Sequence, residues 1–380
     1  MIGAGFMGAA HSQGWRVAPR FFDLPLQPEM AVLVGRDLDR TNEAADRWGW
    51  GETSTDWREV ISRSDIDVVD VVTPGDSHAE IAIAALEAGK HVLCEKPLAN
   101  TVAEAEAMTD AADRAAARGV RSMVGFTYRR VPAATFARDL VAAGRIGEVR
   151  QVRAEYLQDW LSDADAPLTW RLQKDRAGSG ALGDIGAHAV DMTEYITGQR
   201  VERVSGILET IVSERPLLGE ASGLSGSASA ERGAVTVDDL ALFTGRLTSG
   251  ALASFEATRF RLGRKNALRI EISGSTGAIS FDLERLNELE FYDATAPAEE
   301  QGFRRILVTE PGHPYAGAWW PAGHMLGYEH GFSHQAKDFV EAVAEGTAPS
   351  PSFADGLHVQ RVLDAVERSS AGGSAWISVS

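Results

Sequence analysis

The chain has a single cysteine, Cys94, among its 380 residues. One thiol cannot form an internal disulfide, which excludes a disulfide-stapled fold and favours a cytoplasmic setting. We expect Cys94 to be a small buried side chain. Basic residues are also in deficit, because 37 Lys and Arg stand against 54 Asp and Glu and give a formal charge of −17. We therefore expect neither nucleic acid nor a membrane surface as a partner.

Long apolar runs are missing as well. No stretch approaches the roughly 20 apolar residues of a transmembrane helix. We also expect no signal peptide, because the chain goes straight into a glycine motif. Hydrophobic residues still make up 44% of the chain, which is enough for a sizeable core. At about 150 residues per domain, the length indicates two or three domains.

A strand is also lacking in front of the motif Gly3-Ala4-Gly5-Phe6-Met7-Gly8. A dinucleotide-binding turn normally follows a buried strand of about four to eight residues, whereas almost nothing precedes Gly3. We expect the natural protein to begin several residues upstream. The alternative is a damaged first strand that weakens its domain.

Strand and helix patterns alternate through the first third of the chain. Strand-like runs lie at 31–34, 67–72, 91–94 and 122–126, and helical runs lie at 39–48, 77–88 and 102–118. This alternation is typical of βαβ units on a parallel sheet. The prediction is an α/β Rossmann domain at residues 1–127.

The rhythm changes in the second domain, which we predict at residues 128–380. Residues 149–158 form a long strand-like run, and more such runs lie within 236–261 and 268–292. These runs indicate an α+β domain with an open, mostly antiparallel sheet. The Gly-, Ser- and Ala-rich stretch 219–233 is typical of a flexible loop. Amphipathic helices are expected at 332–345 and 353–369, and they can pack back on the Rossmann domain.

The glycine motif predicts a cofactor site. Its glycines allow backbone N–H groups to approach a pyrophosphate, and the following helix adds a favourable partial charge. An acidic residue after the second strand is typical of NAD, and an arginine there suits the phosphate of NADP. Here Gly35 stands where the acid is expected and Arg36 follows, which favours NADP, whereas Asp37 could reverse that choice.

Two segments carry candidate catalytic groups. The first is Glu95-Lys96-Pro97, at the end of a strand in the Rossmann half. Parallel-sheet sites lie at such ends, and a lysine there can take the proton of a substrate hydroxyl. The plainer alternative is a surface lysine after a strand.

The second segment breaks the chain with glycines between 178 and 183 and then begins a helix. Asp184, His188 and Asp191 lie on one face of that helix, so that a carboxylate can orient the imidazole. The alternative is a polar face with an aspartate that complements the helix dipole. These ligands are too few for a convincing metal site, and we expect no metal.

Taken in this order, Gly3–Gly8, Glu95-Lys96-Pro97 and Asp184-x-x-x-His188 resemble the glucose–fructose oxidoreductase and inositol dehydrogenase family, Gfo/Idh/MocA. The resemblance implies hydride transfer between a sugar carbon and NAD or NADP. It also implies a homodimer or homotetramer built through the open sheet, and a Lys96–Pro97 bond that is often cis. Lys96 and His188 would share proton handling, with Asp184 binding substrate. The implied cofactor contacts are Gly3, Gly5, Phe6, Met7, Gly8, Arg36, Asp37, Thr73, Pro74, His78, Glu95 and Lys96.

A finer resemblance, to the levoglucosan dehydrogenase branch, rests on residues 156–160, 168–171 and 177–184. It implies oxidation at ring carbon 3 of an anhydro-glucose or a glucoside. Aromatic faces and polar side chains suit a sugar, although the tryptophans could equally pack in the core. The expected substrate contacts are Tyr128, Gln158, Asp159, Trp160, Trp170, Arg171, Asp184 and His188.

Three other hypotheses about the function remain open at this point. One is an inositol dehydrogenase. A second is a glycosidase that uses tightly bound NAD without net turnover of the cofactor. The third is a non-catalytic nucleotide-binding regulator, which would not need Lys96, Asp184 and His188 together.

Overall fold

The computed structural model describes residues 1–222 and 225–380 and contains two compact units. The first unit joins Met1–Val131 to Thr309–Gln360, and the second joins Pro132–Val308 to Arg361–Ser380. The first compact unit thus combines the N-terminal residues with a segment from the C-terminal part of the chain. The functional boundary at residue 127 stays a prediction.

A parallel sheet forms the centre of the first unit. Its strands are β1 (Val32–Val34), β2 (Glu52–Ser54), β3 (Val68–Val71), β4 (His91–Cys94) and β5 (Ser122–Val124). Strand β1 pairs with β2, and β3, β4 and β5 pair in that order. Ile2 makes parallel bridges to Val34 and Val71, so it stands where the first strand of a Rossmann sheet belongs. The predicted α/β class is confirmed, and Cys94 is buried as expected.

Helices alternate with these strands. They are α1 (Phe6–Phe21), α2 (Leu38–Trp48), α3 (Trp57–Ser62), α4 (His78–Glu87) and α5 (Val102–Ala116). Helix α5 begins with a capping box in which Thr101 and Glu104 satisfy each other's backbone N–H groups. Helix α2 ends at Gly49, whose left-handed backbone, with φ of 87°, suits a residue without a side chain.

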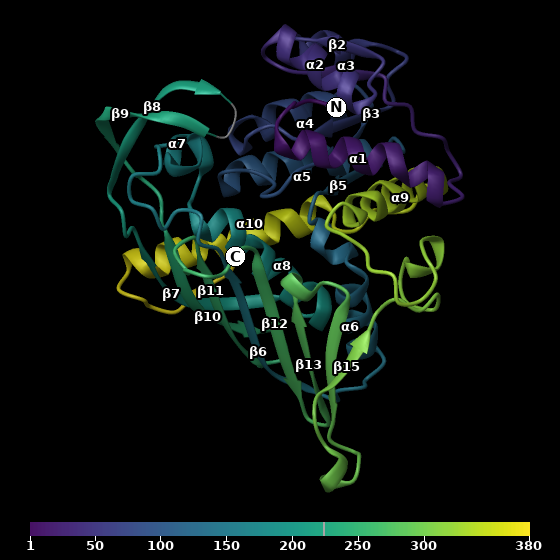
Figure 1. Ribbon diagram of the computed structural model, residues 1–380, viewed down its shortest axis with the longest axis vertical. Coiled ribbons are helices and arrows are strands. Elements are labelled where there is room, and N and C mark those ends of the chain that lie inside the picture. The colour runs from purple at the N-terminus through teal and green to yellow at the C-terminus, as the bar shows by residue number, and fades with distance from the viewer. Residues whose placement is uncertain (223–224) are drawn as a thin grey trace. The chain divides into compact units, whose positions relative to one another are not determined.

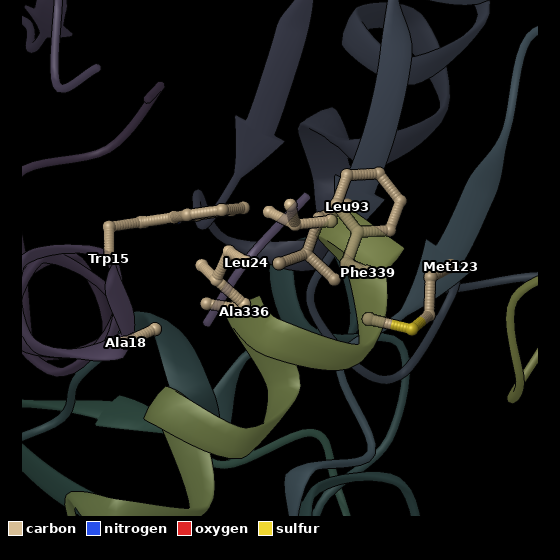
Figure 2. Close-up of a cluster of buried hydrophobic side chains, with 8 residues drawn as sticks. Trp15, Ala18, Leu24, Leu93, Met123, Ala336 and Phe339 are labelled. Carbon is tan, nitrogen blue, oxygen red and sulfur yellow. The ribbon is translucent and has the colours of Figure 1, made fainter. Parts of the chain in front are cut away.

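Helix α9 (His330–Glu345), although late in the sequence, packs on α1 in the first unit. Figure 2 shows the contact, with Trp15 and Ala18 of α1 facing Ala336 and Phe339 of α9. Leu93 and Met123 of the sheet complete the cluster on the side of β4 and β5. Burial of these side chains fixes α1, the helix that follows the glycine motif.

The second unit contains a sheet of nine strands among the described residues (Figure 1). Its order is β15-β14-β13-β12-β6-β11-β10-β7-β16. The bounds are β6 (Val149–Leu157), β7 (Val201–Glu209), β10 (Leu240–Leu247), β11 (Leu252–Thr258), β12 (Ala267–Gly274), β13 (Gly277–Asp282), β14 (Glu288–Asp293), β15 (Arg304–Leu307) and β16 (Ile377–Ser378). Strands β6 and β11 are parallel, and the other neighbouring pairs are antiparallel, as expected.

Helices cover one face of this sheet. They are α6 (Pro132–Ala142) and α8 (Ala187–Thr197). Helix α8 packs on β6, β11 and β12, and α6 packs on α8, β13 and β14. The short α7 (Lys174–Ala177) precedes α8, and α10 (Phe353–Ala371) begins in the first unit and ends in the second.

The expected loop at 219–233 is wrong for its described part. Strands β8 (Glu214–Ser222) and β9 (Ser225–Ala234) pair as an antiparallel hairpin, and residues 223 and 224 lie outside the described residues. Small and polar residues gave no apolar alternation by which a strand could be recognised. The hairpin is instead held by the backbone hydrogen bonds that its two strands exchange.

Among residues 1–222 and 225–380, no helix combines the length and the apolar character needed to cross a membrane.

Candidate functional site

The glycine turn of the first unit fits a pyrophosphate. Gly3 has φ of +119°, and a Cβ there would lie 2.7 Å from the Val72 carbonyl oxygen. A Cβ on Gly8 would lie 2.5 Å from the Gly3 carbonyl oxygen. Helix α1 begins after Gly5, with no side-chain cap and no acidic residue in its first turn among the described residues. Its N–H groups and positive dipole end are therefore available for an anion.

The end of β1 shows why no acidic residue follows that strand directly. A Cβ on Gly35 would lie 2.1 Å from Thr41 Oγ1, so a larger residue does not fit. Asp37 caps α2, its carboxylate accepting from the Arg40 N–H at 3.0 Å, and both Arg36 and Asp37 are exposed. The two side chains on which our prediction of NAD or NADP depends thus both follow the end of the same strand.

The Glu95-Lys96-Pro97 turn follows β4, and the Lys96–Pro97 bond is cis, as the family resemblance implies. Buried His78 places its ring nitrogens 3.0 Å from the Pro97 oxygen and 2.9 Å from the Thr73 oxygen. It thereby holds the turn after β4 to the turn after β3. Its proposed cofactor contact, like those of Thr73 and Pro74, stays a prediction.

Behind this turn lies a buried cluster of charge. His11 Nδ1 is 2.9 Å from Asp70 Oδ2, and His11 Nε2 is 2.9 Å from Glu95 Oε1. Burial alone would lower the pKa of His11, but the charges and hydrogen bonds of Asp70 and Glu95 outweigh it and raise the pKa to about 10. Burial and the same carboxylates raise the pKa of the Cys94 thiol, which keeps it protonated.

Aromatic side chains adjoin the glycine turn and the Lys96 turn. Tyr128 lies in a 3-10 turn (Thr127–Arg130) after β5 and is buried. Its ring centroid is 6.4 Å from that of Tyr328, which in turn stacks at 6.4 Å on Phe6 of the glycine motif. Burial, with Tyr128 and Glu95 nearby, raises the pKa of Tyr328 well above its usual value. The hydroxyl of Tyr328 therefore stays protonated.

In the second unit, Asp184 stands on a π-helical turn (Leu182–Gly186) that leads into α8. Asp238 accepts from the N–H groups of Gly180 and Leu182, both at 2.7 Å, and so fixes the start of this turn. Arg259 Nη2 donates to Asp184 Oδ2 at 2.8 Å and to the Gly180 oxygen at 3.1 Å. The predicted helix after the glycines is confirmed, with a π-turn at its start, a feature that is frequent at functional sites.

His188 is buried one turn further along, where α8 faces the sheet. Its ring centroid lies 5.8 Å from that of Tyr156 on β6. The Tyr156 hydroxyl donates to Asn266 Oδ1 at 2.6 Å, and Gln158 Nε2 donates to the same oxygen at 2.9 Å. His188 and Gln158 are thus connected through two side chains.

The remaining candidate substrate residues continue this network. Trp160 Nε1 donates to Gln158 Oε1 at 2.8 Å, and the Arg259 guanidinium lies 5.4 Å from the Trp160 ring centroid. Asp159 pairs with Lys265 at 2.8 Å, and this hydrogen bond lowers the pKa of Asp159.

Arg171 stacks over Trp170 at 4.5 Å. Burial lowers the pKa of Arg171, Asp184 opposes that shift, and Arg259 adds to it. These effects place Arg171 within electrostatic reach of the Asp184–Arg259 pair.

Sequence reasoning missed Arg259, Asn266, Asp238 and His11. Asn266 and Arg259 lie near the ends of β12 and β11, far in sequence from the residues they hold. A single arginine or asparagine among many carries no spacing signal. His11 had a signal, because it stands one helical turn after Gly8 on the face of α1 that turns toward the sheet.

Comparisons with known proteins agree with this arrangement. A model of the oxidoreductase family with an NAD-binding Rossmann fold matches residues 1–126, and a model of the Gfo/Idh/MocA C-terminal domain matches residues 135–280. A levoglucosan dehydrogenase of Pseudarthrobacter phenanthrenivorans is 43% identical over 384 residues, covering 100% of this chain and 97% of the relative.

Solved structures are similar over the full length. An oxidoreductase domain protein from Kribbella flavida is 65% identical, with a TM-score of 0.95, and the match covers 100% of this chain and 98% of that one. A levoglucosan dehydrogenase in complex with NADH and levoglucosan is 43% identical, with a TM-score of 0.93 and the same coverage.

A Rossmann domain with a glycine turn that fits a pyrophosphate, followed by a sheet domain that gathers aromatic and polar groups, defines a nicotinamide-dependent oxidoreductase. The chain belongs to the Gfo/Idh/MocA family of these enzymes.

Proposed function

We propose that the protein is an NAD-dependent dehydrogenase that oxidises the hydroxyl at ring carbon 3 of levoglucosan or a related neutral glucoside. The observation that carries the proposal is the network in the second unit, where Trp160, Gln158, Asn266, Tyr156 and His188 follow one another. Aromatic faces and amide groups are what a neutral sugar requires. The full-length likeness to a levoglucosan dehydrogenase supports the same substrate class.

In the proposed reaction, the C–H hydrogen leaves as hydride to the nicotinamide while the hydroxyl proton passes to the Lys96 amine. The products are a ketone, NADH and a proton. His188 assists the proton transfer, and Asp184, which accepts a hydrogen bond from Arg259, binds a substrate hydroxyl. These roles rest on the family resemblance and on the chemistry of each side chain.

NAD is proposed over NADP. The family model describes an NAD-binding fold, and the similar solved structure holds NADH. Asp37 is exposed at the end of β1, where a carboxylate suits ribose hydroxyls and repels a phosphate. Arg36 beside it is the residue that would favour NADP, so both cofactors belong in the assay.

The testing experiment measures formation of reduced nicotinamide by absorbance. Levoglucosan, glucose, simple glucosides and the inositols are offered with NAD+ and NADP+ separately. We expect turnover with NAD+ and levoglucosan to exceed turnover with the inositols. The Lys96→Ala variant is expected to lose at least about 100-fold in kcat, the scale of general acid–base catalysis, while NADH binding, followed by fluorescence, persists.

Several outcomes would contradict the proposal. Unchanged turnover in Lys96→Ala would remove the lysine from the mechanism. An inositol as best substrate would replace the substrate class. NADH binding without turnover on any sugar would favour a redox-neutral glycosidase or a regulator.

We also propose a homodimer or homotetramer formed through the open face of the nine-stranded sheet. Ile207 and Leu242 lie opposite each other on β7 and β10, and both are exposed. Neighbouring exposed apolar side chains on the open face of a sheet suit a second copy of the same surface. A cytoplasmic location stays a prediction from the single cysteine.

A further inference from the structure

The strongest feature outside the proposed chemistry is the charge cluster inside the first unit. His11 is 2% exposed and lies between Asp70 of β3 and Glu95 after β4. Trp15 Nε1 also donates to Asp70 Oδ2, at 2.7 Å. The ring of Phe332 on α9 lies 5.3 Å from that of His11 and covers it. Protein groups therefore surround the imidazole, and nothing in the proposed proton transfer uses it.

The hydrogen bonds define the charge of this histidine. Ionised carboxylates only accept hydrogen bonds. Both ring nitrogens of His11 lie within 2.9 Å of a carboxylate oxygen, so both have to donate. An imidazolium meets this requirement, and it balances one of the two buried negative charges, which are unfavourable to bury without a partner.

The cluster connects the two turns that carry the chemistry of the first unit. His11 stands on α1, the helix that begins at the glycine turn, whereas Glu95 directly precedes Lys96. Glu95 Oε2 accepts from the backbone N–H of Lys96 at 3.2 Å. On the other side, a Cβ on Gly125 would lie 2.6 Å from Glu95 Oε1, so the glycine there leaves space for the carboxylate.

We propose that His11 is a positioning residue, which clamps the Glu95 carboxylate and through it holds the Lys96 turn against the cofactor-binding helix. Without the imidazolium, the Glu95 carboxylate loses its charged partner and its fixed orientation, so its contact with the backbone N–H of Lys96 changes. A displacement of about 1 Å at a catalytic base is enough to lower turnover by about 100-fold. The inference rests on the proposed function for its kinetic test.

The first measurement needs no substrate. Nitrogen-15 histidine NMR of the wild-type protein at pH 8.5 is expected to show one imidazolium with two slowly exchanging ring N–H protons. An NOE from one of them to the Trp15 indole N–H identifies it as His11, because both groups donate to Asp70. A His11 ring with a single N–H at this pH would overturn the clamp.

The second measurement separates positioning from stability. His11→Gln is compared with His334→Gln, which alters another fully buried histidine of the same unit. We expect His11→Gln to lower kcat on the best sugar by about 100-fold while the NADH dissociation constant changes less than about threefold. The control is expected to keep kcat within about twofold.

Equal kcat values for the two variants would refute the inference while leaving the proposed function intact. A wild-type protein that oxidises no sugar would instead contradict the proposed function. If His11→Gln does not fold, the NMR spectrum of the wild type still decides whether the clamp exists.

Discussion

Arg259 is a buried cation beside the candidate substrate residues, with 1% of its surface exposed. Its Nη2 bonds the Asp184 carboxylate and the Gly180 oxygen, and its plane lies near Trp160. A buried cation of this kind is strongly destabilising when its partner is lost. The same pairing fixes the orientation of the Asp184 carboxylate, whose oxygens can accept a hydrogen bond from a substrate hydroxyl.

Replacing Arg259 tests the role of this arginine in holding Asp184. In Arg259→Gln the Asp184 carboxylate loses its charged partner and its fixed orientation, so we expect kcat/KM for the sugar to fall by about 100-fold. NADH binding is expected to stay within about twofold. Arg261→Gln, an exposed arginine two residues on, is the control and is expected to leave kcat/KM unchanged.

A fall of equal size in the two variants, or a fall that appears in NADH affinity instead, would contradict the role of Arg259. Steady-state kinetics with NADH fluorescence titration separates these outcomes. Asp184→Asn should cost about as much as Arg259→Gln, and the double variant little more, because residues that act as a unit are not additive.

At the scale of elements, helix α9 is anchored by His334. The Trp319 indole donates to His334 Nε2 at 2.7 Å, and the His334 ring bonds the Arg130 oxygen through Nδ1 at 2.8 Å. An indole only donates and a carbonyl only accepts, so the imidazole is neutral. Burial lowers the pKa of His334 to about 3.

Because His334 is neutral in the folded protein, the free energy of unfolding depends on pH. Its contribution is complete above pH 6.5 and is lost as pH falls toward 3, because the unfolded chain takes up a proton that the folded chain refuses. At pH 5 the loss is roughly 2 kcal/mol, at about 1.4 kcal/mol per pH unit.

The His334→Gln variant isolates that loss. Glutamine keeps an acceptor for Trp319 and a donor for Arg130 but does not titrate. We expect the difference in unfolding free energy between wild type and variant to shift in favour of the variant between pH 7.5 and pH 5, as measured by urea denaturation. A difference that is constant over this range would mean that His334 takes up its proton in the folded protein over the same pH range as in the unfolded chain.

The elements themselves were largely predictable. The strands at 91–94 and 149–158 and the helices near 332–345 and 353–369 could be recognised because apolar periodicity reports burial. The helix at 132–142, the short strand at 52–54 and the hairpin of β8 and β9 were not predicted, since their patterns are short or carry little apolar contrast. Within the site, motif residues could be named, but their partners Arg259 and Asn266 come from distant strands and emerge only from the folded chain.

At the scale of the whole molecule, the net charge and the exposed apolar side chains of the sheet have opposite effects on association between chains. A formal charge of −17 per chain opposes association through long-range repulsion. The open face of the sheet favours association, because Ile207, Leu242 and Leu252 are exposed apolar side chains on it. Arg153, Glu155, Arg269 and Asp282 interleave both signs of charge beside them, which suits a self-complementary contact.

Light scattering after size-exclusion chromatography measures the mass of the protein in solution and so tests whether the chains associate. We expect the wild-type protein to have two or four times the chain mass, and Leu242→Glu to shift it toward the single chain. In an isologous dimer one substitution enters the interface twice, and each new carboxylate loses its solvent without gaining a partner.

Leu26→Glu is the matched control, because Leu26 is 48% exposed in the first unit and Leu242 is 43% exposed on the sheet. A mass that Leu242→Glu leaves unchanged would place the contact elsewhere, and a wild-type mass of one chain would rule out the oligomer itself.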